Sequence, residues 1–453
     1  MARSLAAVAS RVDGQLIGSD AEFGRVETDS RSLSAGALFV AIAGERFDGN
    51  DYVAAAAARG AAGALVSRAQ DVDLPQIAVA DTRRAFGQMA RAWRENFAIP
   101  VVAVTGSAGK TTVKELIASI LGSTRKLCMT EGNLNNDIGV PLILMRLAAE
   151  HEALVVELGA SHAGEIAQLG AWVEPTVAVI TNAGAAHLEG FGSVAGVARA
   201  KGELIDCLAA DGCAVLNADD RFFQDWRRRA GDRRVVSFGL GPAADVHPLG
   251  AVTATSEGSE FTLGLPDGRA VEIRLPLLGR ANIANALAAA AAAAAAGASD
   301  DEIWQGLARA RPVKGRLQRL PGRKGSSLID DSYNANPSAA RAALDYLAEC
   351  SGRRIFVLGD MLELGPEAAD LHRQIGEYAR GRCDRLLAVG PLAAKAAEGF
   401  GPAAEQHADI GSATAAAETL LGPDATILIK ASRSIGLDRL VRALTAAAEA
   451  GSC

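Results

Sequence analysis

The segment from Val101 to Thr112 constrains the fold of this chain more than any other part of its sequence. Residues 101–105 are mostly β-branched, which is typical of a buried parallel strand. The run ends in Gly106-Ser107-Ala108-Gly109-Lys110-Thr111-Thr112, and a helical pattern begins at Val113. Such a turn can bind phosphate, because backbone N–H groups and the positive end of the helix point at the same place. Lys110 would neutralise the outer phosphates, and the hydroxyl of Thr111 would hold Mg²⁺.

This turn is a shortened form of the phosphate-binding loop. The longer form has a glycine six positions before the lysine, where this chain has Val104. The strand before the turn and the helix after it favour a phosphate site over a chance glycine turn. We therefore predict that the protein handles a nucleoside triphosphate.

Length and composition limit the class of protein. A chain of 453 residues is too long for one ordinary core, so two or three domains are expected. Apolar residues make up 49% and charged residues 22%, which is typical of soluble globular domains. The formal net charge of −7 argues against a general nucleic-acid surface. The one basic cluster, around Arg227 to Arg229, is predicted to be a solvated helix face beside Asp225 and Asp232.

The cysteines and the apolar segments indicate a cytoplasmic protein. The six cysteines show no Cys-x-x-Cys spacing and are too few for a disulfide scaffold in so long a chain. The apolar run Leu5 to Ala9 is too short for a signal peptide. The longest apolar tract, Ala286 to Ala296, is well below the roughly 20 residues of a membrane span. We expect no stable insertion into a membrane.

The order of predicted strands and helices indicates an α/β protein of three domains, with boundaries at 1–97, 98–312 and 313–453. The first is a small α/β domain, and the second and third are built on parallel sheets. The predicted strands are 37–42, 64–67, 76–79, 101–105, 153–158, 176–181, 213–217, 328–331, 354–358, 385–389 and 426–430. The predicted helices are 52–59, 86–96, 282–296, 338–350, 368–382 and 437–448. A few antiparallel strands are expected between Val235 and Leu275, and a linker at Pro312 to Arg316.

Polar side chains follow two strands of the predicted central sheet. Glu157 lies at the end of one strand, and His187 follows another. Ligands gather at the carboxyl ends of parallel strands, and a carboxylate there is costly unless it meets a cation. Glu157 is therefore predicted to share a Mg²⁺ ion with Thr111, and a capping or salt-bridged glutamate is the alternative. His187 is also consistent with an ordinary loop histidine, since Mg²⁺ prefers oxygen ligands.

Two clusters of short polar side chains are candidate substrate sites. One is Asn133-Leu134-Asn135-Asn136-Asp137-Ile138-Gly139, and the other is Asp330-Asp331-Ser332-Tyr333-Asn334-Ala335-Asn336-Pro337. Each is consistent with an ordinary turn. Several amides near a phosphate loop would also suit a polar substrate that carries many oxygens.

Together these segments resemble the Mur ligase family, the ATP-dependent amide-forming enzymes of peptidoglycan precursor synthesis, over nearly the whole chain. The similar segments are 105–112, Gly132 to Pro141, Glu157 to Ala160, Asn182 to Gly190, Gly279 to Ala286 and Gly315-Arg316. Three further segments resemble the member that adds a terminal dipeptide, namely Asp331 to Pro337, Gly359 to Gly365 and Lys430 to Ser434. The resemblance implies a P-loop central domain, a Rossmann-like C-terminal domain and an N-terminal domain that binds a uridine nucleotide.

The resemblance also implies the cofactors ATP and Mg²⁺ and the residues that bind them. The ATP contacts would be Gly106, Ser107, Ala108, Gly109, Lys110, Thr111 and Thr112, with Asn282 at the adenine and Arg316 nearby. The Mg²⁺ contacts would be Thr111, Glu157 and His187. Lys201 aligns with a lysine that is carbamylated in several members and supports a second metal ion, and an ordinary solvated lysine is the alternative. The implied catalytic residues are Lys110, Glu157, His187 and Lys201.

The implied substrates are a UDP-muramoyl tripeptide and D-Ala-D-Ala, which are joined through an acyl phosphate. The implied substrate contacts are Ser30, Arg31, Asn133, Asn135, Asn136, Asp137, Asp331, Tyr333, Asn334, Asn336, Ser432 and Arg433. The third domain is expected to close over the site and bring its residues with it. We expect a monomer with no nucleic-acid partner.

Three other activities also fit a phosphate loop of this kind. A tripeptide-forming Mur ligase and a ligase like folylpolyglutamate synthase are the alternatives that remain. The second of these lacks a uridine-binding first domain, and the residues before the loop argue against it. A GTPase switch would need an Asn-Lys-x-Asp guanine reader, which this chain does not contain.

Overall fold

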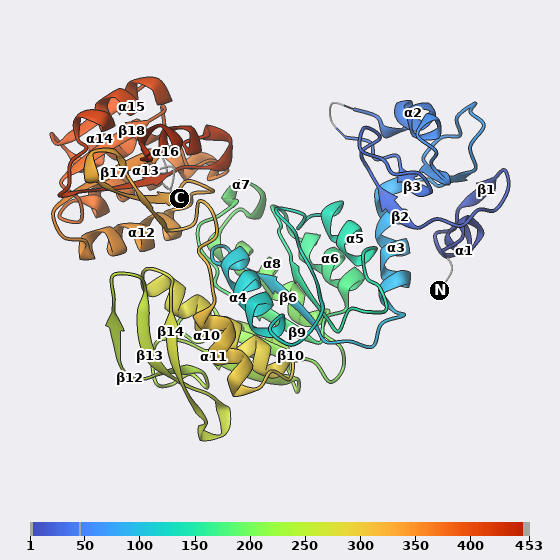
Figure 1. The fold of residues 1–453 in the computed structure, drawn as a ribbon, viewed down its shortest axis with the longest axis horizontal. Coiled ribbons are helices and arrows are strands. Elements are labelled where there is room, and N and C mark those ends of the chain that lie inside the picture. The colour runs from blue at the N-terminus through green and yellow to red at the C-terminus, as the bar shows by residue number, and fades with distance from the viewer. Residues whose placement is uncertain (1–2, 45–46, 447–453) are drawn as a thin grey trace, which may run out of the picture.

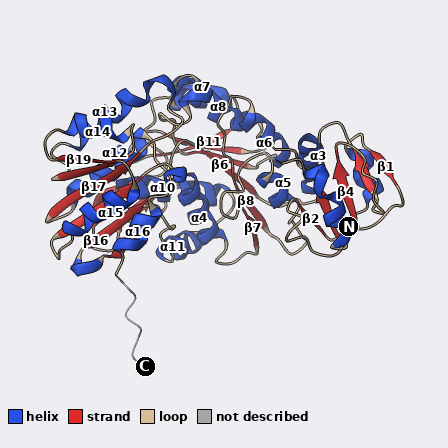
Figure 2. Ribbon diagram, turned by 90° about the horizontal axis from the view of Figure 1, so that it is seen from above, coloured by secondary structure: helices blue, strands red, loops and turns tan. Residues whose placement is uncertain are grey.

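The computed structural model describes residues 3–44 and 47–446 and contains three α/β parts (Figure 1). The first and the last part lie at opposite ends of the molecule, with the central part between them (Figures 1 and 2). Within the described ranges, no helix combines the length and the apolar character needed to cross a membrane. The predicted α/β class with parallel sheets is confirmed.

The first part is a five-stranded sheet in the order β1-β5-β4-β3-β2, and only β1 runs antiparallel to its neighbour. Its elements are α1 (Leu5–Arg11), β1 (Gln15–Ile17), β2 (Arg25–Glu27), β3 (Ala37–Val40), α2 (Val53–Ala58), β4 (Gly63–Val66), β5 (Gln76–Ala78) and α3 (Thr82–Arg94). The sequence analysis missed β1 and β2, because these short edge strands are half exposed and carry no apolar run. Helix α3 begins before its predicted start at Phe86, because the carboxylate of Asp81 accepts hydrogen bonds from the N–H groups of Arg83 and Arg84.

The central part is a six-stranded parallel sheet in the order β11-β10-β9-β6-β8-β7. Its elements are β6 (Val101–Thr105), α4 (Lys110–Leu121), β7 (Leu127–Met129), α5 (Gly139–Leu144), β8 (Ala153–Glu157), α6 (Glu165–Val173), β9 (Val177–Ile180), α7 (Leu188–Phe191), α8 (Val194–Asp206), β10 (Cys213–Asn217), α9 (Phe223–Ala230) and β11 (Arg234–Phe238). Alternate residues of β6 enter different cores, since Val101 and Ala103 pack with α6 and α8 while Val102 and Val104 pack with α4. Both faces of the sheet are therefore covered by helices, as Figure 2 shows.

A small antiparallel sheet, β12 (His247–Ala254), β13 (Ser259–Gly264) and β14 (Ala270–Leu275), follows the central sheet. The antiparallel region starts later than predicted, because residues 234–238 form β11, which pairs in parallel with β10. Helices α10 (Arg280–Ala295) and α11 (Asp300–Ala308) then pack against α4. The small side chains of Ala286 and of the alanines at 288–293 are buried, so α10 can approach its neighbours closely.

The C-terminal part is a second doubly wound sheet in the order β15-β16-β20-β17-β18-β19, with only β15 antiparallel. Its elements are β15 (Gln318–Pro321), β16 (Ser327–Asp331), α12 (Pro337–Glu349), β17 (Arg353–Gly359), α13 (Ala368–Ala379), β18 (Arg385–Val389), α14 (Ala393–Phe400), β19 (Ala404–His407), α15 (Ile410–Thr419), β20 (Ala425–Lys430) and α16 (Asp438–Leu444). The last helix ends before its predicted end, and the predicted residues 447–448 lie outside the described ranges, as does Cys453. The other five cysteines are free thiols.

Candidate active site

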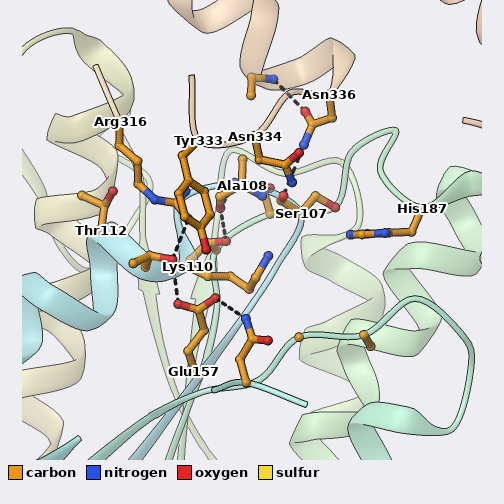
Figure 3. Close-up of a pocket in the computed structure, with 18 of the residues that line it drawn as sticks. Ser107, Ala108, Lys110, Thr112, Glu157, His187, Arg316, Tyr333, Asn334 and Asn336 are labelled. Atoms are coloured by element: carbon orange, nitrogen blue, oxygen red, sulfur yellow. Dashed lines mark hydrogen bonds between the residues drawn. The ribbon is translucent and has the colours of Figure 1, made fainter. Parts of the chain in front are cut away.

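A cleft of about 1000 Å³ lies where the carboxyl ends of the central strands face the C-terminal part. Figure 3 shows residues of both parts pointing into it. The predicted residues that line it are Ser107, Ala108, Gly109, Lys110, Thr111, Thr112, Asn133, Asn135, Asn136, Asp137, Glu157, His187, Asn282, Arg316, Asp331, Tyr333, Asn334, Asn336 and Arg433. The structure thus gathers most of the predicted site, although its members come from distant parts of the chain.

The glycine-rich loop is held in place by the loop that follows β9. Asn182 clamps Ala108, because its side-chain oxygen accepts from the Ala108 N–H across 2.9 Å and its amide nitrogen donates to the Ala108 carbonyl across 3.1 Å. Gly109 has a φ of +85° and begins α4 without offering a side-chain cap. The N–H groups of the first turn of α4 have no partner within the helix, so they can receive an anion. This geometry fits the phosphates of a nucleotide.

Lys110 lies at the start of α4, and its side chain turns back over the loop. The ammonium Nζ donates to the carbonyl of Gly106 across 2.8 Å. Burial lowers the pKa of Lys110, and the charge of Glu157 opposes that effect. A cation held in this position can neutralise phosphate oxygens that enter the cleft.

Thr111, Glu157 and Asn135 form a hydrogen-bonded group below the loop. The Thr111 hydroxyl donates to Oε2 of Glu157 across 2.7 Å, and the amide of Asn135 donates to Oε1 across 2.8 Å. Glu157 is 3% exposed, and within the described ranges it has no ion-pair partner. A buried carboxylate that receives hydrogen bonds only from neutral groups is suited to bind a cation. Hydroxyl and carboxylate oxygens are the ligands that Mg²⁺ prefers.

The cluster of acidic or histidine side chains that an all-protein metal site needs is absent from the described ranges. In phosphate-transfer sites Mg²⁺ is held by one or two carboxylates together with phosphate oxygens and water. The oxygens of Thr111 and Glu157 could hold Mg²⁺ in this way beside a bound nucleotide.

Lys201 lies behind the cleft and does not line it. It is 2% exposed, so the alternative of a solvated lysine is wrong. Its Nζ lies 3.4 Å from the carbonyl of Ala160 and 5.3 Å from the ring centre of Phe191. Burial, together with the positive charge of Lys110, lowers the pKa of Lys201 to about 7. Much of this amine is therefore uncharged near neutral pH, which is the form that reacts with carbon dioxide.

The C-terminal part contacts the phosphate loop directly. The side-chain amide of Asn336, which also caps α12, donates to the carbonyl of Ser107 across 3.3 Å. In the linker between the two parts, Nη2 of Arg316 donates to the Thr111 hydroxyl across 2.8 Å. The guanidinium carbon of Arg316 lies 4.4 Å from the ring centre of Tyr333, so the two groups stack. The guanidinium carbon of Arg433 lies 5.9 Å from the same ring centre. The linker and the C-terminal part therefore form one side of the cleft.

Known protein families match the sequence of this chain. Three family models cover most of the chain: the Mur ligase family catalytic domain at residues 22–100, the Mur ligase middle domain at 104–293, and the Mur ligase glutamate ligase domain at 315–433. The chain belongs to the Mur ligase family.

Relatives at higher similarity share the whole length of this Mur ligase. It is 45% identical to the UDP-N-acetylmuramoyl-tripeptide–D-alanyl-D-alanine ligase of Escherichia coli K12, over 98% of this chain and 97% of that protein. The crystal structure of MurF from Acinetobacter baumannii is 36% identical, with a TM-score of 0.92 and coverage of 98% of both chains. The MurF ligase of Thermotoga maritima, solved in complex with ADP, is 28% identical with a TM-score of 0.84, over 92% of this chain and 96% of that one.

Five predicted residues of this Mur ligase do not line the cleft: Gly106, which is buried beneath the loop, Lys201, Ser30, Arg31 and Ser432. Ser30 and Arg31 belong to the N-terminal part, where Arg31 is exposed and paired with Asp29 at 2.8 Å. Ser432 is buried, and its hydroxyl accepts a hydrogen bond from the N–H of Leu362 across 2.9 Å. In this structure Ser432 therefore holds a loop of the C-terminal part.

The sequence analysis missed several residues that line the cleft. The most informative is Arg83 on α3, which pairs with Asp137 at 2.8 Å and donates to the carbonyl of Ala43 across 3.0 Å. It links the N-terminal part to the amide-rich loop, and no local motif marked it. Lys430 also lines the cleft, and its Nζ pairs with Asp331 at 2.6 Å. The sequence analysis named the segment Lys430 to Ser434 but did not predict Lys430 itself as a site residue.

Proposed function

We propose that this Mur ligase uses ATP to join D-Ala-D-Ala to a UDP-N-acetylmuramoyl tripeptide, which yields the pentapeptide precursor of peptidoglycan, ADP and phosphate. One observation carries the proposal: a single cleft joins the phosphate loop to the C-terminal segments that contain Asp331 to Asn336 and Lys430 to Arg433. Close similarity over the whole chain to a ligase of that name supports the choice of substrates.

The reaction requires an activated carboxyl group. A carboxylate does not react with an amine at neutral pH, because resonance and charge repel the nucleophile. Transfer of the γ-phosphoryl group to the tripeptide carboxylate gives an acyl phosphate, and the amine of D-Ala-D-Ala then displaces phosphate through a tetrahedral intermediate. For such a transfer the protein supplies mainly positioning and charge stabilisation.

The residues around the loop suit those tasks. Lys110 lies against the loop that would bind the phosphates. The N-terminus of α4 adds its partial positive charge at the same place. Thr111 and Glu157 would hold Mg²⁺, which when bound would neutralise charge on the phosphate oxygens. His187 lines the same cleft and is proposed to serve a second metal site, supported by the buried Lys201. Asn282 is proposed to contact the adenine. Its side-chain nitrogen donates to the carbonyl of Leu278, and its side-chain oxygen accepts from the amide of Asn285.

The C-terminal side of the cleft suits the second substrate and excludes water. Asn336 and Arg316 bridge the two parts, which would protect an acyl phosphate from hydrolysis. Arg433 lines the cleft, and its side chain is 63% exposed. We assign it to the carboxylate of the dipeptide, because a guanidinium binds a carboxylate through two hydrogen bonds.

The three predicted domains are proposed to divide the work. Residues 1–97 would bind the uridine nucleotide through Ser30, Arg31 and the exposed Phe47, residues 98–312 would bind ATP, and residues 313–453 would bind the dipeptide. The family models, which match 22–100, 104–293 and 315–433, support this division. We propose a cytoplasmic monomer, since one chain supplies residues from three parts to the cleft.

The test is phosphate release from ATP with purified protein and defined substrates. We expect turnover with UDP-muramoyl tripeptide and D-Ala-D-Ala, and none with UDP-muramoyl dipeptide and diaminopimelate or lysine. The reverse pattern would identify a tripeptide-forming ligase. Turnover with a folate and glutamate would identify a folylpolyglutamate synthase, and either result would overturn the proposal.

A further inference from the structure

Glu363 contacts a residue of the site although the proposed chemistry gives it no role. It lies in the loop after β17, in the segment Gly359 to Gly365. Its carboxylate oxygen Oε2 pairs with Nδ1 of His187, in the loop before α7. The main-chain carbonyl of Glu363 also accepts a hydrogen bond from the N–H of Glu189 across 3.3 Å. Two contacts therefore connect the C-terminal part to the segment 187–189, which carries the histidine assigned to the second metal.

Both members of the pair have an uncommon backbone conformation. His187 has a φ of +52° and Glu363 a φ of +62°, a region that residues with a side chain rarely occupy. Such conformations persist only where the surroundings hold them, and they gather at functional sites. Two strained residues from different parts of the chain thus meet each other at the edge of the cleft.

The loop that carries Glu363 is anchored to its own domain. The N–H of Met361 donates to Nε2 of the buried His372 across 2.9 Å, and the N–H of Leu362 donates to the hydroxyl of Ser432 across 2.9 Å. These bonds fix the two residues directly before Glu363. The carboxylate is therefore presented from a rigid support, and Ser432 contributes to that support rather than to the cleft.

The pairing uses one nitrogen of the imidazole and leaves the other for the cleft. Nδ1 faces Glu363, with the hydroxyl of Ser161 farther away at 3.4 Å. In Figure 3 the His187 ring points from the loop before α7 toward the loop of Ser107 and Lys110. Histidines that bind metals usually donate their other N–H to a carboxylate, which fixes the tautomer and the orientation of the ring.

We infer that Glu363 is the positioning residue of His187: by accepting a hydrogen bond from Nδ1–H it directs the Nε2 lone pair into the cleft, toward a divalent cation. The inference rests on the metal role that the proposed function gives to His187. Because Glu363 belongs to the C-terminal part, His187 is oriented only when that part docks on the centre of the molecule. Binding of the cation and docking of the C-terminal part then strengthen each other by the same factor.

The experiment measures Mn²⁺ binding to the full-length protein in complex with ADP, by the loss of the electron paramagnetic resonance signal of free Mn²⁺. Glu363→Ala is expected to weaken one Mn²⁺ site by about 10- to 100-fold, as removal of such partners does elsewhere. Glu363→Gln keeps an acceptor for Nδ1 and should restore part of the affinity. The exposed Glu367, at the end of the same loop, provides the matched control, and Glu367→Ala should bind Mn²⁺ as the natural protein does.

A double-mutant cycle decides whether Glu363 acts through the histidine. In a His187→Ala background, Glu363→Ala should cause no further loss of Mn²⁺ affinity. Unchanged affinity in Glu363→Ala, unchanged affinity in His187→Ala, or an equal loss in both backgrounds would each overturn the inference. ADP affinity and circular dichroism check that each variant folds. If Glu363→Ala does not fold, Glu363→Gln takes its place in the cycle. Because the Mn²⁺ signal needs no turnover, failure of the ligase assay would reject the proposed function separately.

Discussion

The hydroxyl of Thr111 donates a hydrogen bond to the carboxylate of Glu157 across 2.7 Å, although 46 positions separate the two residues in the chain. They meet because β6 and β8 are neighbours in the central sheet, so the loop after one strand lies beside the last residue of the other. The N–H of Glu157 donates in turn to the hydroxyl of Thr130 across 2.9 Å. Hydrogen bonds thus hold both the main chain and the carboxylate of Glu157.

Replacing Glu157 by glutamine should separate charge from shape. Glu157→Gln keeps the volume and most hydrogen bonds but removes the buried charge, so we expect kcat to fall about 100-fold while the thermal midpoint stays the same or rises. Phosphate-release assays over a range of Mg²⁺ concentrations and thermal unfolding measure the two effects. Glu150→Gln, in an exposed turn, is the control; equal activity of the two variants would contradict a role for Glu157.

Removal of the loop lysine should abolish turnover and leave the fold intact. Lys110 is half-buried and burial lowers its pKa, so Lys110→Ala removes a poorly solvated charge and should cost little stability. Turnover should fall at least about 100-fold, because the cation no longer stabilises the transferring phosphoryl group. Lys126→Ala, at an exposed position, should keep full activity. Retained activity in Lys110→Ala would remove the loop from the mechanism.

A methyl group on Gly109 should block nucleotide binding. Its φ of +85° disfavours any side chain, and a Cβ there would collide with the side-chain oxygen of Asn285. Gly192 has the same left-handed conformation, with a φ of +73°, but open space around it, so Gly192→Ala reports the backbone effect alone, about 1 kcal/mol. Calorimetric titration with ADP should show weak or no binding for Gly109→Ala and normal binding for Gly192→Ala. Normal ADP affinity in both variants would show that the loop tolerates the methyl group.

The buried lysine should make stability depend on pH in a defined window. Lys201 has a pKa of about 7 in the folded protein against 10.5 as its ordinary value, so between these values the unfolded chain binds more protons and stability rises with pH. Lys201→Met removes the cost of burying the charge. We expect it to raise the free energy of unfolding most below pH 7, by a few kcal/mol, and progressively less toward pH 10.

Urea unfolding at pH 6, 7, 8 and 9 in carbonate-free buffer measures the difference between natural protein and Lys201→Met. The same variant should lose ligase activity, because methionine cannot be carbamylated. Lys126→Met serves as the exposed control and should show a difference that does not change with pH. A constant difference for Lys201→Met would mean that its charge is not suppressed by burial.

Local sequence patterns determined much of the fold. The strands Val101–Thr105, Cys213–Asn217 and Arg385–Val389 were predicted at their observed bounds, because each is an apolar run closed by a polar or glycine residue. The loop from Gly106 to Thr112 was recognisable for a similar reason: its glycines, lysine and threonines are adjacent in the chain. Short edge strands such as β1 and β15 escaped prediction, because half-exposed strands lack the apolar run that marks a buried one.

The sequence by itself thus determined the class of fold and the position of the phosphate loop, since both depend on contiguous residues. The tertiary structure alone decided which distant side chains meet: Arg83 with Asp137, Asn336 with Ser107, and Glu363 with His187. It also decided that Lys201 is buried and that Ser432 supports a loop instead of facing the cleft. Burial and pairing depend on how separate sheets pack against one another, and no local pattern in the chain contains that information.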